Sequence, residues 1–364
     1  MARGGARRPG GTGRRRCHRR ARGGADPLRA RRMSGFAVRP FKTALYAPPV
    51  QPDLADWHRR LRRMDDSGLT AITVSDHFRT GRQDPLPTLA AIASVTGRVR
   101  VMALVLANDY RHPVITHKAA ATLDLIAQGR FDLGLGAGYL AEEYRSAGIP
   151  FDPAPQRVDR LEEALAIIVA LFGEAPVRHR GVHYTIDGLI GTPAPVQRPH
   201  PPLVVGGGGR RMLTLAGRYA DIVGVHSNLR HGTAYDAAVI TDMLPDTMAR
   251  KIAWARTAAE RAGRDPDALD YLSITWTCRV VERPADVDPV LREVCRRYGV
   301  DPAIGRRSTG LLVGTVEQCL EQLHERRAEL GLNYVDFGAA DFDEIAPLVA
   351  ALSTETPGRS PTSH

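Results

Sequence analysis

Arg130-Phe-Asp-Leu-Gly-Leu-Gly-Ala-Gly-Tyr139 is the stretch of sequence from which the fold can be inferred. It reads as a short aliphatic strand that runs into three alternating glycines, Gly134, Gly136 and Gly138. Because glycine lacks Cβ, a strand end with several glycines lets a ligand ring approach the backbone closely. A second apolar strand ends in the glycine run Leu203-Val-Val-Gly-Gly-Gly-Gly209. Two such ends predict one site assembled from several strands.

The positive charge of the chain is concentrated at its beginning. The formal net charge is +10 over 364 residues, yet residues 1–32 hold twelve arginines and a single acid, Asp26. The remainder is nearly neutral, which argues against a nucleic-acid-binding body. No run of about 18 apolar residues occurs, so we expect no membrane span.

The Arg/Gly-rich head has no apolar segment of the kind that secretory signals need. It cannot bury enough apolar surface to offset the entropy of ordering, so we expect residues 1–35 to be a disordered basic extension. We interpret it as an upstream extension, with Met33 as the natural start of the protein. A basic arm that touches nucleic acid or acidic surfaces, and a targeting peptide, are the alternatives. Residues 36–353 would form the folded domain and residues 354–364 a disordered tail.

The four cysteines show no paired spacing. Cys17, Cys278, Cys295 and Cys319 include no Cys-x-x-Cys pair, and the histidines have no ligand spacing. We therefore predict free thiols in a reducing, cytoplasmic compartment and no metal site.

Eight apolar segments alternate with helical patterns. The expected strands are 41–47, 70–75, 99–106, 130–135, 203–205, 221–225, 271–281 and 334–337. The expected helices are 54–67, 85–97, 116–128, 157–172, 212–218, 247–262, 287–298, 315–330 and 342–353, with hairpin chemistry at 183–188. Such alternation means a parallel sheet, and buried aliphatic runs mean a sheet covered on both faces.

Eight units in this length predict a (β/α)₈ TIM barrel with insertions. The alternative is a doubly wound sheet, which carries its glycine fingerprint in the first strand-to-helix turn. Here the first strand ends in Pro48-Pro49. We therefore predict the barrel.

In such barrels the chemistry lies at the C-terminal ends of the strands. These ends carry Ser75-Asp76-His77, Ala107-Asn108-Asp109, Gly136–Tyr139, Gly206–Gly209 and His226-Ser227-Asn228. They are rich in glycine and poor in clusters of carboxylates or cysteines. This composition favours a seat for a large planar cofactor over a hydrolytic or metal site.

Asp76-His77 is the most informative pair. A histidine beside a carboxylate at a strand end can act as a general acid or base near neutral pH. The alternative is a loop histidine on a solvated turn. Tyr139, Glu142 and Glu143 follow the first glycine run and could face the site or cap the next segment.

The run Gly206–Gly209 precedes a helix, so its free backbone N–H groups favour a phosphate. Arg210 and Arg211 add positive charge. A flexible turn is the alternative here, and close packing of barrel and helix is the alternative for Gly134–Gly138.

Several segments carry a family resemblance in addition. They are Val74–His77, Asp84–Ala93, Thr96–Arg100, Arg111–Pro113, Leu123–Phe131, Leu135–Tyr144, Arg160–Glu163, Pro195–Pro202 and Gly217–Asp221. In this order they resemble the bacterial-luciferase-like superfamily and, within it, the coenzyme F420-dependent (5-deazaflavin) oxidoreductases. The likeness covers about Phe41 to Val349.

The resemblance implies a catalytic role for His77 beside the redox centre of the cofactor, and a non-proline cis peptide at Leu104-Val105. Ala137 and Gly138 would line the ring system, and the strand-five loop would hold the phosphate. The cofactor-binding set that it implies is Asp76, Leu104, Val105, Ala107, Ala137, Gly138, Glu142, Gly207, Gly208, Gly209, Arg211 and Met212.

Two departures argue against sugar-phosphate oxidation. Tyr139 stands where the F420-dependent sugar-phosphate dehydrogenases carry a catalytic glutamate. Those enzymes also bind the substrate phosphate with lysines, whereas Lys42, Lys118 and Lys251 are the only lysines of this chain.

The sequence thus leads to an F420-dependent oxidoreductase that transfers a hydride to or from a small organic substrate. Reduction of an activated C=C, C=N or C=O bond is the direction we expect. The first alternative is an FMN-dependent monooxygenase that uses reduced flavin and O₂. The second is a cofactor-free or nucleic-acid-binding role for the arginine-rich head. We expect no nucleic-acid or membrane partner, and the resemblance implies a homodimer.

Overall fold

The computed structural model describes residues 39–79, 83–229 and 236–355. The disorder predicted for residues 1–35 falls outside these residues, as does the predicted tail from residue 356 on. Of that tail, Thr354 and Glu355 are described. Glu355 Oε1 lies 2.8 Å from Nε2 of His324, which is on α12 (Val316–Leu330).

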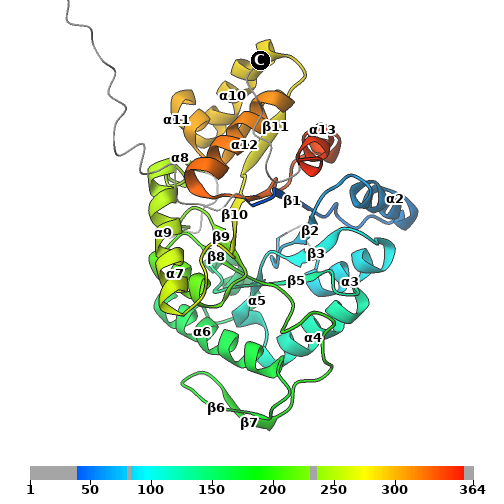
Figure 1. The fold of residues 1–364 in the computed structure, drawn as a ribbon, viewed down its shortest axis with the longest axis vertical. Helices are drawn as coiled ribbons and strands as arrows, with labels where there is room; N and C mark the ends of the chain where they lie inside the picture. Colours follow the sequence, from blue (N-terminus) through cyan, green and yellow to red (C-terminus); the bar gives the residue numbers. More distant parts are fainter. Residues whose placement is uncertain (1–38, 80–82, 230–235, 356–364) are drawn as a thin grey trace, which may run out of the picture. The chain divides into compact units, whose positions relative to one another are not determined.

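Parallel strands close into a barrel (Figure 1). In barrel order they are β1 (Lys42–Tyr46), β2 (Ala71–Val74), β3 (Arg100–Ala103) with β4 (Leu106–Ala107), β5 (Phe131–Gly136), β8 (Leu203–Gly207), β9 (Ile222–Val225), β10 (Asp270–Ile274) and β13 (Tyr334–Asp336). β13 pairs with both β10 and β1, and β3 pairs with β5, so the ring has no open edge. The predicted (β/α)₈ barrel is confirmed.

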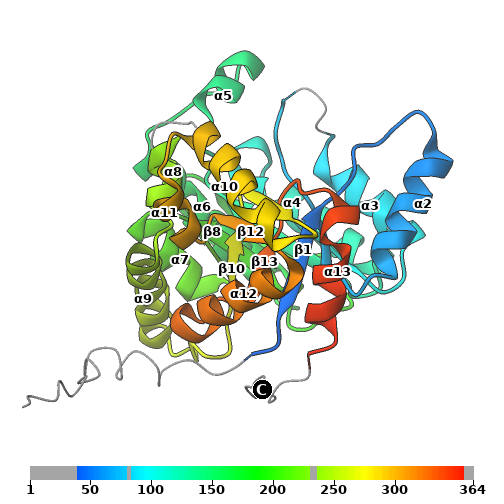
Figure 2. The same cartoon turned by 90° about the horizontal axis from the view of Figure 1, so that it is seen from above.

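Helices cover the outside of the barrel (Figure 2). They are α2 (Leu54–Asp65), α3 (Pro85–Val95), α4 (Pro113–Ile126), α6 (Ala154–Leu171), α7 (Arg210–Tyr219), α9 (Pro245–Arg261), α12 (Val316–Leu330) and α13 (Phe342–Ser353). α2 shows why they form: Asp53 caps its first turn, and Trp57, Leu61 and Met64 bury one face.

Four helices begin earlier than the apolar periodicity predicts. α4 begins at Pro113, α6 at Ala154, α9 at Pro245 and α10 (Pro284–Tyr298) at Pro284. Each has proline in its first turn. Proline is favoured there because its fixed φ suits a helix and its missing N–H would be unpaired anyway.

The predicted strand 271–281 is wrong as a single element. β10 ends at Ile274, and the chain then leaves the barrel as β11 (Thr277–Val280), which pairs with β12 (Leu311–Gly314). Because β11 pairs with β12 outside the barrel, its residues do not belong to the central sheet. α10 and α11 (Pro302–Arg307) complete this insertion, and α8 (Ala237–Thr241) lies before α9. The predicted hairpin is present as β6 (Val177–Arg180) and β7 (Thr185–Leu189).

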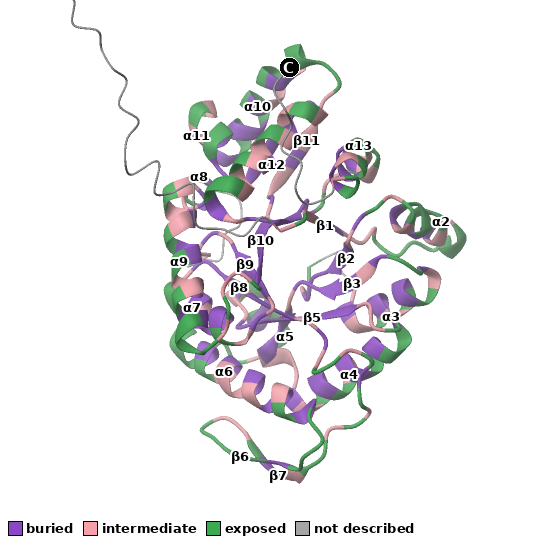
Figure 3. Cartoon of the chain, viewed as in Figure 1, coloured by how far each residue is buried: buried purple, intermediate pink, exposed green. Residues whose placement is uncertain are grey.

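The barrel interior is polar at its N-terminal end and apolar above it. Lys42 pairs with Asp270 at 2.6 Å, and Arg100 pairs with the buried Asp132 at 2.6 Å. A layer of small and aliphatic side chains follows: Ala44, Ala71, Met102, Val204, Ile222 and Leu272. Buried residues therefore fill the strands and the inner faces of the helices (Figure 3). No helix among the described residues is long and apolar enough to cross a membrane.

Candidate active site

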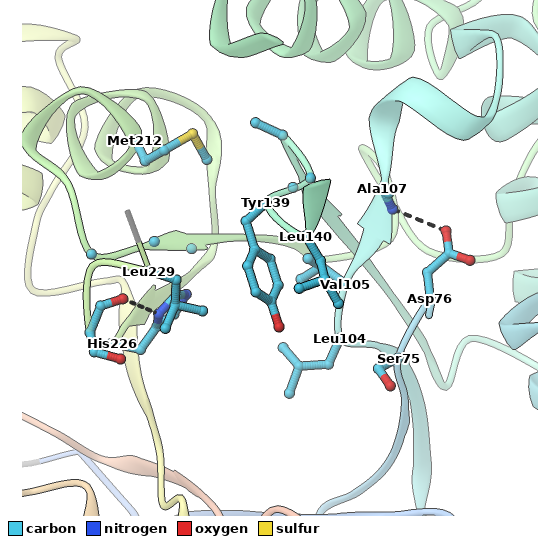
Figure 4. Close-up of a pocket in the computed structure, with 18 of the residues that line it drawn as sticks. Ser75, Asp76, Leu104, Val105, Ala107, Tyr139, Leu140, Met212, His226 and Leu229 are labelled. Atoms are coloured by element: carbon cyan, nitrogen blue, oxygen red, sulfur yellow. Dashed lines mark hydrogen bonds between the residues drawn. The ribbon is translucent and has the colours of Figure 1, made fainter. Parts of the chain in front are cut away.

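A cavity of about 970 Å³ opens at the C-terminal ends of the strands. It brings together His77 and every residue of the predicted cofactor-binding set except Glu142. Figure 4 shows Leu104 and Tyr139 around the same space as Met212 and His226, whereas Asp76 points to the backbone nitrogen of Ala107. Glu142 is exposed on α5 (Ala141–Ala147), whereas its neighbour Glu143 is buried and lines the cavity. Adjacent helix residues point in different directions, and here Glu143 faces the cavity while Glu142 faces solvent.

Asp76 ties two strand ends together. Its Oδ2 accepts a hydrogen bond of 3.0 Å from the backbone N–H of Ala107, and Arg111 donates to both of its carboxylate oxygens. The side chain is only 4% exposed. The carboxylate therefore fixes the end of β2 against β4, and this orients the residue that follows it.

His77 is held by a carboxylate. Its Nδ1 lies 2.9 Å from Glu143 Oε2, while Glu143 Oε1 makes an ion pair of 3.4 Å with Arg79 but no hydrogen bond. The ring of Tyr139 meets the imidazole edge-on, with 5.8 Å between the ring centroids. The imidazole is therefore held between a carboxylate and an aromatic ring where it lines the cavity.

The glycines of β5 serve close packing first. A Cβ on Gly134 would lie 1.9 Å from Ala103 O, and one on Gly136 would lie 2.7 Å from Val105 Cγ2. Both glycines thus make room for the bulge between β3 and β4, where the Leu104-Val105 peptide bond is cis, as the resemblance implies. The two glycines do serve close packing, but against the neighbouring strand bulge and not against a helix. They hold the bulge, and with it the side chains of Leu104 and Val105, at the floor of the cavity.

Gly138 and Arg157 shape the loop that follows β5. Gly138 has φ +70, and a Cβ there would lie 1.8 Å from the hydroxyl oxygen of Tyr144. Arg157, which is buried, donates to the carbonyl oxygens of Ala137 and Gly138. These two carbonyls are therefore engaged from behind, and the opposite side of the loop lines the cavity.

The second glycine run packs closely and then begins α7. A Cβ on Gly208 would lie 2.2 Å from the backbone nitrogen of Asn228, whereas one on Gly209 would meet only Asn228 Nδ2, at 3.7 Å. Gly209 is the N-cap of α7, and no side chain caps this helix. Its first-turn N–H groups are available to an anion at the cavity. Arg211 lines the cavity but also donates to Asp159 and to Pro155 O.

Sequence reasoning missed the support beneath His226. Lys251 is only 2% exposed, and its Nζ donates to His226 O at 2.9 Å and to Asp242 Oδ2 at 2.6 Å. Burial lowers the pKa of His226 to about 4, so the ring is neutral near pH 7. The signal that could have revealed these contacts is the presence of a lysine on the apolar face of α9.

No group of three or more His, Cys, Asp or Glu side chains in the described part of the chain is arranged to hold a metal ion. The cavity instead combines backbone N–H groups, an oriented histidine and apolar walls. This combination suits a large organic ligand that carries a phosphate.

Sequence comparison connects this geometry to known proteins. The family described as luciferase-like monooxygenase matches residues 33–309. The F420-dependent glucose-6-phosphate dehydrogenase of Microbacterium testaceum is 31% identical over 164 residues, which are 43% of this chain and 48% of the relative. The F420-dependent hydroxymycolic acid dehydrogenase of Mycobacterium tuberculosis is 30% identical over 234 residues, 61% of this chain and 60% of the relative. The chain spans about half the length of the first of these curated relatives.

Solved structures share the fold. An F420-dependent secondary alcohol dehydrogenase in complex with an F420-acetone adduct aligns with a TM-score of 0.69 at 20% identity, over 86% of this chain and 99% of that one. The monooxygenase RslO1 from Streptomyces bottropensis aligns with a TM-score of 0.67 at 21% identity, over 86% and 97%. At these identities the likeness shows the fold alone.

Proposed function

The chain belongs to the luciferase-like monooxygenase family, and on this premise we propose that it is an F420-dependent oxidoreductase. It transfers a hydride between the deazaflavin and a small organic substrate. One observation carries the proposal: the cavity gathers His77 and all but one of the residues expected to contact F420. Two of the relatives are named as F420-dependent dehydrogenases, and this supports F420 as the cofactor.

The residues around the cavity fit such a cofactor. The uncapped first turn of α7 can bind a phosphate through its N–H groups. The Oγ atoms of Ser75 and Ser227 are buried at the cavity wall and have no hydrogen-bond partner among the described residues. A polar group buried without a partner is costly, so both hydroxyls suit a ligand with polar edges. When bound, F420 supplies the ring that takes up or gives the hydride.

His77 is the residue that moves the proton. Because Glu143 accepts a hydrogen bond, Nδ1 carries the hydrogen and Nε2 is left to hold or release a proton toward the cavity. Asp76 and Glu143 fix the ring, and the walls limit the access of water. In the direction we propose, an activated C=C, C=N or C=O bond is reduced and His77 supplies the coupled proton.

A binding titration tests the cofactor. The purified protein should bind F420 saturably, with quenching of the deazaflavin fluorescence, and should bind FMN more weakly. Tight binding of FMN without affinity for F420 would remove the proposal. Oxygen-dependent turnover with reduced FMN would then establish the monooxygenase alternative.

This proposal predicts that the basic N-terminal segment is not needed for folding or for F420 binding. A protein that lacks residues 1–32 should remain folded and should keep its affinity for F420. Loss of the main activity on this deletion, with F420 affinity retained, would favour a role built on the arginine-rich head.

We also propose that the protein is a homodimer. Three large apolar side chains are exposed on α4, namely Ile115 (57%), Leu125 (44%) and Ile126 (42%). An exposed apolar face of this kind is typical of an interface. Sedimentation velocity should show a dimer, and Ile115→Asp should shift it toward the monomer. A monomeric wild-type protein would refute the dimer.

A cytoplasmic location fits the thiols. Cys278, Cys295 and Cys319 are free and buried, as expected in a reducing compartment. Fractionation of the producing cells should recover the protein with the cytosolic fraction, and recovery with secreted proteins would contradict this location.

A further inference from the structure

The cavity has two halves of different character. The ends of β2, β4, β5 and β8 and the start of α7 form the half proposed for the cofactor. The other half is formed by the end of β1 and by residues at and beyond the ends of β10 and β13. Its walls include Tyr46, Leu272, Ile274, Thr275, Trp276 and Gly338. No residue of this second half belongs to the cofactor-binding set.

The second half offers no charge to a ligand. Of the described residues that line it, none is an acid, an arginine, a lysine or a histidine. The charged residues elsewhere in the cavity are engaged by protein groups. Asp76 is paired with Arg111, and Asp152 with Arg160. The guanidinium of Arg157 is likewise committed to backbone carbonyl oxygens.

The surface of this half is apolar and continuous with the core. Leu272 is fully buried, and the side chains of Tyr46 and Ile274 pack on the barrel's interior cluster. Trp276 directs its indole N–H to Met243 Sδ at 3.1 Å, so its polar atom is turned to the protein. At Gly338 a Cβ would lie 3.0 Å from Thr275 O, and the small residue leaves the wall open.

Besides the Tyr46 hydroxyl and the Trp276 indole N–H, the walls of this half include the hydroxyl of Thr275. Thr275 Oγ1 is buried and has no hydrogen-bond partner in the described part of the chain. A hydroxyl in an apolar pocket can bind a single carbonyl or hydroxyl oxygen and so orient a ligand. It cannot balance the charge of a phosphate or a carboxylate.

We propose that this half of the cavity binds an uncharged, largely apolar ketone, aldehyde or unsaturated carbonyl compound, or the matching alcohol, and that it rejects phosphorylated sugars. The inference rests on the proposed function, because the substrate half is defined as the part that the cofactor leaves open. Substrate selection then depends on Ile274 and Trp276 and not on an ion pair.

Calorimetry with a chain-length series tests the inference without relying on turnover. The probes are 2-butanone, 2-hexanone, 2-octanone and glucose 6-phosphate, titrated into the full-length protein with and without bound F420. Affinity for the ketones should rise by up to about fourfold for each added CH₂ group, and glucose 6-phosphate should not bind. Binding of glucose 6-phosphate in preference to the ketones, ketone affinity independent of chain length, or no binding of any probe would overturn the proposal.

Substitutions locate the binding to this half. Ile274→Lys should weaken 2-octanone binding at least tenfold, and Ile274→Val should weaken it only about threefold. Both variants should keep the F420 affinity of the wild type. Unchanged ketone binding in Ile274→Lys would overturn the proposal. If Ile274→Lys does not fold, the chain-length series on the wild type still decides. Failure of F420 binding with a normal ketone series would count against the proposed function alone.

Discussion

His77 Nδ1 and Glu143 Oε2 lie 2.9 Å apart across the mouth of the barrel. The contact joins the loop after β2 to helix α5, which are 66 residues apart in the chain. The Glu143 side chain is 7% exposed, and the His77 side chain is 25% exposed. A buried carboxylate thus faces one nitrogen of a ring whose other edge can reach the cavity. This arrangement selects one tautomer of a neutral imidazole.

Removal of this acceptor should lower turnover more than cofactor affinity. We expect Glu143→Ala to reduce kcat roughly 10- to 100-fold, since an oriented hydrogen bond to a charged group contributes about 1.5–3 kcal/mol. Glu143→Gln keeps an oxygen that can accept from Nδ1 and should recover part of the loss. His77→Ala should reduce kcat further, with F420 affinity within about threefold of the wild type. Steady-state kinetics and fluorescence titration of F420 measure both quantities.

The control for this series is Glu174→Ala, an exposed residue beyond the end of α6. It should leave both kcat and F420 affinity unchanged. Equal losses of F420 affinity and kcat in Glu143→Ala would mean that the Glu143 carboxylate fixes the loop after β2 as a whole and does not specifically orient the His77 imidazole. Glu142→Ala adds a separate test, because the resemblance implies that it weakens F420 binding.

Gly138 is predicted to be intolerant of any side chain. Gly138→Ala places a Cβ at a φ of +70 and 1.8 Å from the Tyr144 hydroxyl, which is itself held by Asp109 at 3.1 Å. The conformation alone should cost about 1 kcal/mol, and the overlap should add to it. We expect a lower midpoint of thermal unfolding and weaker F420 binding, because the β5 loop lines the cavity.

Gly148→Ala is a matched control. Gly148 has φ +68, but nothing lies within 4 Å of its Cβ position. The difference in unfolding free energy between the two variants therefore reports the overlap alone. Tyr144→Phe should rescue Gly138→Ala in part, since it removes the nearest atom and leaves the ring at 2.8 Å. Equal destabilisation by the two glycine substitutions would contradict the account.

The sequence predicts the barrel because aliphatic runs, glycine ends and proline or acid helix starts agree along the chain. The sequence does not show that the barrel strand β10 ends at Ile274 and that a separate strand, β11, begins at Thr277 and pairs with β12. Both strands are rich in β-forming residues, so the break between them leaves no mark in the pattern. The sequence also cannot separate Glu142 from Glu143. Which of two adjacent glutamates turns inward depends on where α5 begins, and its N-cap Leu140 makes no side-chain cap that could mark that point. Lys251 needs the fold as well, because its partners lie up to 25 residues away.

The Lys251–Asp242 pair should be a larger stability determinant than the surface pairs. Lys251 is 2% exposed, and Asp242 Oδ2 also accepts from the Asn228 N–H at 2.7 Å. Lys251→Met leaves that carboxylate without its ammonium partner and removes the Lys251 hydrogen bond to the His226 carbonyl oxygen. A broken buried pair costs about 3–5 kcal/mol, and because Asp242 is 32% exposed we expect the lower end.

Urea unfolding measures this effect in a double-mutant cycle. Lys251→Met with Asp242→Asn should be less destabilising than the sum of the two single changes, because the unpaired charge is gone. Arg60→Met, at an exposed position of α2, should change the free energy of unfolding by less than about 0.5 kcal/mol. Strict additivity in the cycle would show that the two groups act independently.

Asp336 should make stability depend on pH. The side chain is fully buried, its Oδ1 accepts from the Gly338 N–H at 2.9 Å, and its Oδ2 has no hydrogen-bond partner in the described structure. Burial raises the pKa of Asp336 from 3.8 to about 7, and the hydrogen bond from Gly338 offsets only part of this effect. The folded state thus binds the proton more tightly than the unfolded chain.

The sign follows from proton linkage. The stabilising contribution of the protonated Asp336 is complete below pH 3.8 and is lost as the pH rises to about 7. At about 1.4 kcal/mol for each pH unit, the loss is at most about 4 kcal/mol. His226 acts in the opposite direction, since its lowered pKa removes stability as the pH falls from 6.5 to about 4. In the wild-type protein the two contributions therefore oppose each other between about pH 4 and pH 6.5.

Asp336→Asn isolates the carboxyl, because His226 is common to both proteins and cancels in the difference. The variant keeps an oxygen for the Gly338 N–H but cannot ionise. Its free energy of unfolding relative to the wild type should therefore increase steadily from pH 4 to pH 7 and level off above it. Urea unfolding at half-unit pH steps measures the difference. Asp66→Asn, whose side chain is 71% exposed, controls for the loss of a surface charge, and parallel curves for Asp336→Asn and the wild type would show that the buried carboxyl is ionised throughout.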